Sequence, residues 1–178
     1  MNAPPRSEPD PLRPVRLRDL NQSDPAVAAA LLRPCLDVDR WVASLVDGRP
    51  YASVDELFTT ARAAASPFTA AELEAALAHH PRIGERAGGR STEATLSRSE
   101  QATLTLDEDV QRQLAEGNQA YEQRFGRVFL IRAAGRSSAD ILAQLHTRLA
   151  NDPDTEDEVV ADQLRQIALV RLAGVIST

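Results

Sequence analysis

The feature that most constrains the fold of this chain is a recurring helix-start signal. A Ser or Thr is followed three residues later by Glu, and apolar residues then recur with the period of an α-helix. In such a pair each side chain satisfies a backbone N–H group that a helix start leaves without a partner. The pattern predicts an all-α fold, a single-domain bundle of about eight helices. The pairs are Ser53/Glu56, Thr69/Glu72, Ser97/Glu100, Thr105/Glu108 and Thr155/Glu158.

The composition agrees with a helical fold. The chain is rich in Ala, Leu, Arg, Glu and Asp, and only 4% of its 178 residues are aromatic, which favours helix over strand. Residues 128–131 resemble a strand, but no partner strand is evident, so we expect an extended segment there. The length fits one core. We therefore expect a disordered, proline-rich tail over residues 1–17 and one helical domain over residues 18–178.

The charged residues and the cysteine exclude several classes of protein. All twenty basic residues are Arg, and without Lys the chain cannot form a lysine Schiff base, hold pyridoxal phosphate covalently or build a P-loop. The net charge of -6 argues against general nucleic-acid binding. The single cysteine, Cys35, fits a reducing cytoplasmic setting, and we interpret it as a small core residue. No apolar run approaches the length of a membrane span, so we expect no membrane partner.

The stretch AHHPRIGE, from Ala78 to Glu85, is the clearest candidate for a functional site. We expect the helix that starts at Thr69 to end at His80, where Pro81 stops it. An imidazole at a helix end can act as a general acid or base, although it can equally interact with the free carbonyls of the last turn. His79 and the next residue point about 100° apart on a helix and cannot share one ion, so we expect no metal site.

Polar residues further along leave alternatives open. Glu100 has the capping-box spacing from Ser97, which alone would explain it. Ser97 or Ser99 could pair with a histidine as a nucleophile, but no nucleophile-elbow glycine pattern surrounds either serine. Residues 85–96 are expected to form a loop long enough to cover a site. Asn118 lies on an apolar helical stripe, where it could bond a backbone carbonyl or contact a substrate.

Several segments together resemble the 2-oxo-4-hydroxy-4-carboxy-5-ureidoimidazoline (OHCU) decarboxylase family, which takes part in ureide formation from urate. The resemblance runs from about Leu20 to Gly174, and HPRIGE is its most specific part. It implies an all-α, cofactor-independent enzyme, commonly a homodimer, that converts its small-molecule substrate to (S)-allantoin with loss of CO2. The segments that carry it are LLRPC, DRWV, RPYASVDELFTTA, ALAHHPRIGE, SEQA, NQAYEQRFGRVFLI, GRSSADIL and RLANDPDTEDE, followed by IALVRLAG.

The resemblance also implies roles for individual residues. His80 matches the catalytic histidine, as proton donor or hydrogen-bond partner of the reacting centre. Glu100 would contact the substrate hydroxyl or disfavour the departing carboxylate by its charge. Arg171 or Arg136 would pair with the substrate carboxylate, and Arg132 stands where the family usually has a small or apolar residue. The alternative is a non-catalytic ureide-binding or scaffolding protein on the same fold. The substrate-binding residues implied are Pro81, Ser97, Gln101, Leu130, Ile131, Ala133 and Arg171.

Overall fold

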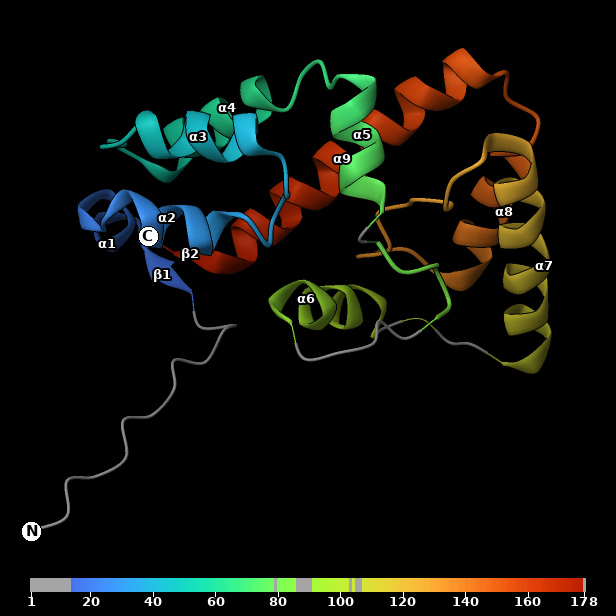
Figure 1. Cartoon of the computed structure of the whole chain (residues 1–178). Helices are drawn as coiled ribbons and strands as arrows, with labels where there is room; N and C mark the ends of the chain where they lie inside the picture. Colours follow the sequence, from blue (N-terminus) through green and yellow to red (C-terminus); the bar gives the residue numbers. More distant parts are fainter. Residues whose placement is uncertain (1–13, 79, 86–90, 103, 105–106, 178) are drawn as a thin grey trace, which may run out of the picture.

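The long C-terminal helix α9 crosses the molecule, with α1–α4 toward its C-terminal half and α7 packed beside α8 at the other side of the molecule (Figure 1). The computed structural model describes residues 14–177 with gaps at 79, 86–90, 103 and 105–106. The all-α prediction is confirmed. In this described part of the chain, no helix is long and apolar enough to cross a membrane. The elements are β1 (Val15–Arg16), α1 (Leu17–Gln22), α2 (Pro25–Leu32), α3 (Asp39–Asp47), α4 (Val54–Ala64), α5 (Ala70–Leu77), α6 (Thr92–Gln101), α7 (Glu108–Phe125), α8 (Ser138–Arg148), α9 (Pro153–Val175) and β2 (Ile176–Ser177).

A short strand pair joins the two ends of the described chain. β1 pairs in parallel with β2, with Val15 opposite Ile176. Residues 14–17, which we had assigned to the disordered tail, therefore belong to the folded part, while residues 1–13 lie outside the described residues. Two-residue strands are too short to show an alternating pattern in sequence, and their pairing depends on where α9 ends.

Some of the predicted helix starts are confirmed. Thr69 and Glu72 form both halves of a capping box at the start of α5. Ser53 accepts a hydrogen bond from the Glu56 N–H at the start of α4, as expected, but the Glu56 carboxylate accepts from Ala52. Gly126 ends α7 with a positive φ of 69°, a conformation that favours glycine.

Other predicted starts are wrong because a second capping residue lies nearby. α9 begins at Pro153, where Asp152 accepts from the Thr155 N–H, so Thr155 is not the cap. α7 begins after Asp107, whose side chain accepts from the Val110 N–H, and Thr105 lies outside the described residues. Asp caps a helix as well as Ser or Thr does, so spacing alone could not choose between them.

Two apolar clusters form the core. The larger one joins α1–α5 to α9 and contains Trp41 and Leu172, and the smaller one lies around α7 and α8 with Tyr121 and Leu145. Cys35 is buried, and burial raises the pKa of its thiol to about 12, so its interpretation as a core residue is confirmed.

Residues 128–131 run between these clusters as the extended segment that we expected. Leu130 belongs to the larger cluster, whereas its neighbours Phe129 and Ile131 belong to the smaller one. This alternation is the period of an extended chain that is buried on both sides. The segment is therefore anchored from two directions.

A buried ion pair fixes this segment to the helices. Glu156 has no exposed surface and accepts hydrogen bonds from Arg148 Nε (2.9 Å), Asn151 Nδ2 (2.8 Å) and the Tyr121 hydroxyl. Arg148 Nη1 in turn donates to the Leu130 carbonyl (2.7 Å), and its guanidinium lies 4.5 Å from the centre of the Phe129 ring. The network connects α7, α8 and α9 to residues 129–130.

We predict that Glu156→Gln lowers the free energy of unfolding by about 3–5 kcal/mol, because it leaves the Arg148 guanidinium buried without a counter-charge. Urea denaturation measures the loss. The control is Asp109→Asn in the pair between Arg112 and Asp109, whose side chains are 61% and 73% exposed. There the expected change is below about 1 kcal/mol. Equal losses in the two variants would contradict the prediction.

Candidate active site

His80 lies just beyond the end of α5. The helix ends at Leu77, three residues before the predicted end at His80, and His80 itself precedes Pro81, a position that disfavours helical backbone. His80 N–H donates to the Leu77 carbonyl (3.0 Å), and ring atom Nδ1 lies 2.8 Å from the Ala76 carbonyl oxygen. A carbonyl only accepts, so Nδ1 carries a proton and Nε2 is the nitrogen that can gain or lose one. His79 lies outside the described residues.

A cavity of about 20 Å³ brings most of the predicted site residues together. The cavity is small and partly open to solvent. Arg171 and Arg136 are not in its described lining. The lining residues that the sequence predicted are His80, Pro81, Ser97, Glu100, Gln101, Leu130, Ile131 and Ala133, and those it missed are Ile83, Phe129 and Ile167.

α6 presents three polar residues to this cavity. Ser97, Glu100 and Gln101 have the i, i+3, i+4 spacing that places side chains on one helix face. α6 begins at Thr92, and the Ser91 side chain accepts from the Ala94 N–H as its cap. The capping interpretation of Ser97 and Glu100 is therefore wrong, and the predicted loop over residues 85–96 is helical from residue 92 onwards.

An ion pair with α9 holds the Glu100 carboxylate. Arg171 Nε donates to Glu100 Oε1 (2.6 Å) and Nη2 to Oε2 (3.2 Å), which is a two-point contact. Arg171 Nη2 also lies 3.1 Å from the Ser97 hydroxyl, and Nη1 donates to the Pro34 carbonyl (3.3 Å). Arg171, 5% exposed, thus lies behind Glu100 instead of facing the cavity as an expected partner for a substrate carboxylate. Arg136, the other candidate, donates to the Arg132 carbonyl (3.1 Å).

The wall opposite α6 is the extended segment around Leu130. Arg132, which departs from the family pattern, donates through its backbone N–H to Gln163 Oε1 (3.0 Å) and through Nε to Gln166 Oε1 (3.1 Å). Its side chain therefore lies along α9, and Arg132 is not in the described cavity lining. This contact leaves the wall to Phe129, Leu130, Ile131 and Ala133.

The residues missed on α9 follow a simple signal. Gln163, Ile167 and Arg171 are spaced by four residues, so they share one face of the helix. The extended segment around Leu130 is bonded to this face through Gln163, and Ile167 lines the cavity. A prediction that extended the Arg171 stripe toward the start of the helix would have found both residues.

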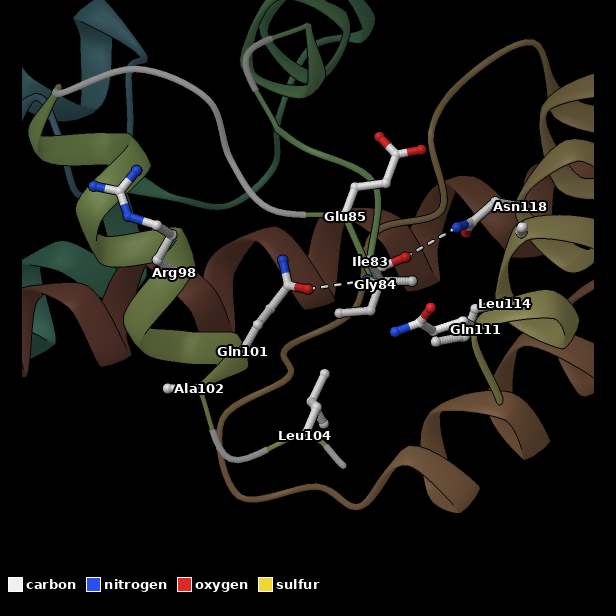
Figure 2. Close-up of a pocket in the computed structure, with 11 residues that line it drawn as sticks. Ile83, Gly84, Glu85, Arg98, Gln101, Ala102, Leu104, Gln111, Leu114 and Asn118 are labelled. Carbon is white, nitrogen blue, oxygen red and sulfur yellow. Dashed lines mark hydrogen bonds between the residues drawn. The ribbon is translucent and has the colours of Figure 1, made fainter. Parts of the chain in front are cut away.

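A larger pocket of about 750 Å³ adjoins the cavity (Figure 2). The two spaces share Ile83 and Gln101 in their walls. Asn118 of α7 lines the larger pocket and donates through Nδ2 to the Ile83 carbonyl (3.0 Å), so the predicted bond to a backbone carbonyl is confirmed. Gln101 Oε1 accepts from the Gly84 N–H (3.0 Å).

These groups give the small cavity a defined chemistry. It combines an imidazole nitrogen that can exchange a proton, a fixed carboxylate and an amide, and its other walls are mainly apolar. In such a partly buried site, fixed charges and hydrogen bonds act on a ligand more strongly than in bulk solvent. The arrangement suits proton transfer and charge stabilisation at one bound small molecule.

Comparisons with known proteins point to one family. A family model described as OHCU decarboxylase matches residues 21–173. The chain is 32% identical over 138 residues to the 2-oxo-4-hydroxy-4-carboxy-5-ureidoimidazoline decarboxylase of Haloferax volcanii, which covers 75% of this chain and 79% of that protein. It is 36% identical over 106 residues to the uric acid degradation bifunctional protein TTL of Arabidopsis thaliana, which covers 57% of this chain and 33% of that protein.

A solved structure shares the fold. The crystal structure of an OHCU decarboxylase in the presence of (S)-allantoin aligns with a TM-score of 0.67 at 24% identity, covering 85% of this chain and 96% of that one. The chain spans about a third of the length of the bifunctional relatives from Arabidopsis thaliana and Bacillus sp. (strain TB-90). The family match over most of the chain, together with the Haloferax volcanii relative, shows that this protein belongs to the OHCU decarboxylase family.

Proposed function

We propose that this protein decarboxylates OHCU to (S)-allantoin in urate degradation, without a cofactor. The observation that carries the proposal is the convergence of His80 with Ser97, Glu100 and Gln101 on one cavity, in a chain of this family. The breaking bond joins the ring to the carboxylate carbon, and CO2 leaves without the bonding electrons. The imidazoline ring accepts that electron pair, so the protein has to orient the substrate and deliver one proton to one face.

In this mechanism His80 is the proton donor. Its Nδ1 proton is held by the Ala76 carbonyl (2.8 Å), so the neutral ring has one defined tautomer. A proton taken up on Nε2 can be given to the substrate, after which the ring returns to that tautomer. The hydrogen bond also fixes the ring plane, which supports delivery to a single face of the substrate.

Glu100 acts through its fixed negative charge. The contact with Arg171 orients the Glu100 carboxylate, whose side chain keeps 16% of its surface exposed and lines the cavity. A substrate carboxylate beside it is repelled, and this repulsion ends when neutral CO2 forms. The same oxygens can accept a hydrogen bond from the substrate hydroxyl. The backbone of residues 130–133 and the side chains of Pro81, Ser97 and Gln101 complete the binding site.

We further propose that the protein works as a homodimer in the cytoplasm. The family resemblance supports the homodimer, and the single buried Cys35, which has no second cysteine to pair with, fits a reducing compartment. Sedimentation velocity of the purified protein tests the oligomeric state, and a monomer at micromolar concentration would refute the dimer.

We predict that His80→Ala loses about 10²- to 10⁴-fold of the rate enhancement while the protein remains folded, because it removes the general acid. Circular dichroism that follows fresh substrate measures the appearance of (S)-allantoin. His146→Ala, an exposed histidine in α8, is the matched control and should keep wild-type activity. If His80→Ala converted the substrate at the wild-type rate and with the same stereospecificity, the proposed mechanism would be wrong. If wild-type protein gives only the slow spontaneous decay, the alternative of a ureide-binding protein holds instead.

We also predict that Arg171→Met destabilises the protein by about 3–5 kcal/mol, because Glu100 keeps its charge without a partner. The double variant Arg171→Met with Glu100→Gln should recover much of this stability but not the activity. Urea denaturation and the circular dichroism assay measure the two quantities on the same samples. Arg136→Met is the control for loss of an arginine and should change neither. Recovery of activity along with stability would show that Glu100 has no role beyond pairing with Arg171.

A further inference from the structure

Two side-chain amides hold a single peptide group next to the proposed active site (Figure 2). Gln101 Oε1 of α6 accepts from the Gly84 N–H (3.0 Å), and Asn118 Nδ2 of α7 donates to the Ile83 carbonyl (3.0 Å). That N–H and that carbonyl belong to the same peptide group. The group lies in the turn that follows His80 and Pro81, so two helices fix this turn from opposite ends of one peptide bond.

The chemistry of the peptide group fixes the orientation of both amides. A backbone N–H can only donate, so it must face the Gln101 oxygen, and a carbonyl can only accept, so it must face the Asn118 nitrogen. Gln101 therefore has its amide nitrogen, Nε2, left for a ligand. Figure 2 shows this nitrogen directed away from Gly84. Gln101 lines both the His80 cavity and the larger pocket, so this nitrogen is a hydrogen-bond donor where the two spaces adjoin.

The peptide group needs to be held because its glycine permits two orientations. Gly84 has a φ of +86°, and glycine populates positive and negative φ about equally. Rotation of the Ile83–Gly84 peptide group would require Gly84 φ to change sign, which glycine allows at little cost. Such a rotation would turn the Gly84 N–H away from Gln101 and free the Gln101 amide to invert. Asn118, which is 4% exposed, opposes this rotation from the other end of the peptide group.

We propose that Asn118 is a positioning residue for substrate recognition. By holding the Ile83–Gly84 peptide group, it keeps Gln101 oriented with its nitrogen as a donor to an oxygen atom of the substrate, either a carbonyl or a carboxylate. Asn118 acts through Gln101, since it lines the adjoining pocket and is not in the described lining of the His80 cavity. The identity of the substrate rests on the proposed function, whereas the hold on the peptide group does not.

Asn118→Leu tests the proposal because leucine has nearly the same size and cannot donate a hydrogen bond. Amide hydrogen exchange at Gly84, measured by NMR without ligand, should become faster by about tenfold or more. The KM of the decarboxylation and the Kd for (S)-allantoin should rise by a similar factor, with a smaller fall in kcat. Asn118→Asp is a second variant in case leucine prevents folding, since an ionised carboxylate cannot donate to the Ile83 carbonyl.

Two further variants separate positioning from stability. Gln101→Glu keeps an oxygen for the Gly84 N–H but has no N–H for the substrate, so it should lose affinity while Gly84 exchange stays as in wild type. Leu57→Ala removes a fully buried side chain of the larger core cluster and should lower the Tm without changing Gly84 exchange or KM. The conditions of each exchange measurement must keep the variant folded, as checked by circular dichroism.

Wild-type Gly84 exchange and wild-type affinity in both Asn118 variants would overturn the inference, and so would faster exchange with unchanged KM and Kd. An effect of Leu57→Ala on Gly84 exchange and KM as large as that of Asn118→Leu would reduce Asn118 to a general structural role and also overturn the inference. These failures are distinguishable from failure of the proposed function. If wild-type protein does not accelerate decarboxylation, the function fails, while Gly84 exchange and the Kd still decide the role of Asn118.

Discussion

The structure depends on the buried pair between Arg148 and Glu156. Charges without exposed surface are tolerated only when they are paired and their remaining hydrogen-bonding groups are satisfied, and here Tyr121, Asn151 and the Leu130 carbonyl complete the network. One of these partners is the backbone of the cavity wall. The wall is therefore held by charged groups that are not in the described lining of the cavity. Its side that faces the cavity can be apolar because these groups fix its position.

The pair between Arg171 and Glu100 has the same chemistry, but its carboxylate is more exposed. Glu156 has no exposed surface, and its carboxylate is surrounded by donors. Glu100 keeps 16% of its side chain exposed and lines the cavity, so its arginine orients it and leaves part of the carboxylate facing the site. Both carboxylates are held by an arginine, and the two pairs differ in that Glu100 is partly exposed and lines the cavity.

Sequence patterns within a few residues predicted the parts of the structure that short-range interactions determine. The capping box at Thr69 and the stop at Gly126 are set by groups within a few residues, and both were found. The start of α6 was missed because Ser91 and Ser97 are both competent caps. The contact of Asn118 with Ile83 could be assigned only as a bond to some carbonyl, since its partner lies 35 residues away. The resemblance supplied the cavity residues, but it could not show that Arg171 lies behind Glu100.

The two walls of the cavity are held in different ways. The wall at residues 129–133 is tied to α8 through Arg148 and to α9 through Gln163. The α6 wall is tied by Arg171 to Ser97 and Glu100, and by Gln101 to Gly84. These α6 ties are made by the groups expected to contact the substrate, so the contacts that hold this wall also orient the groups that would bind the reacting molecule.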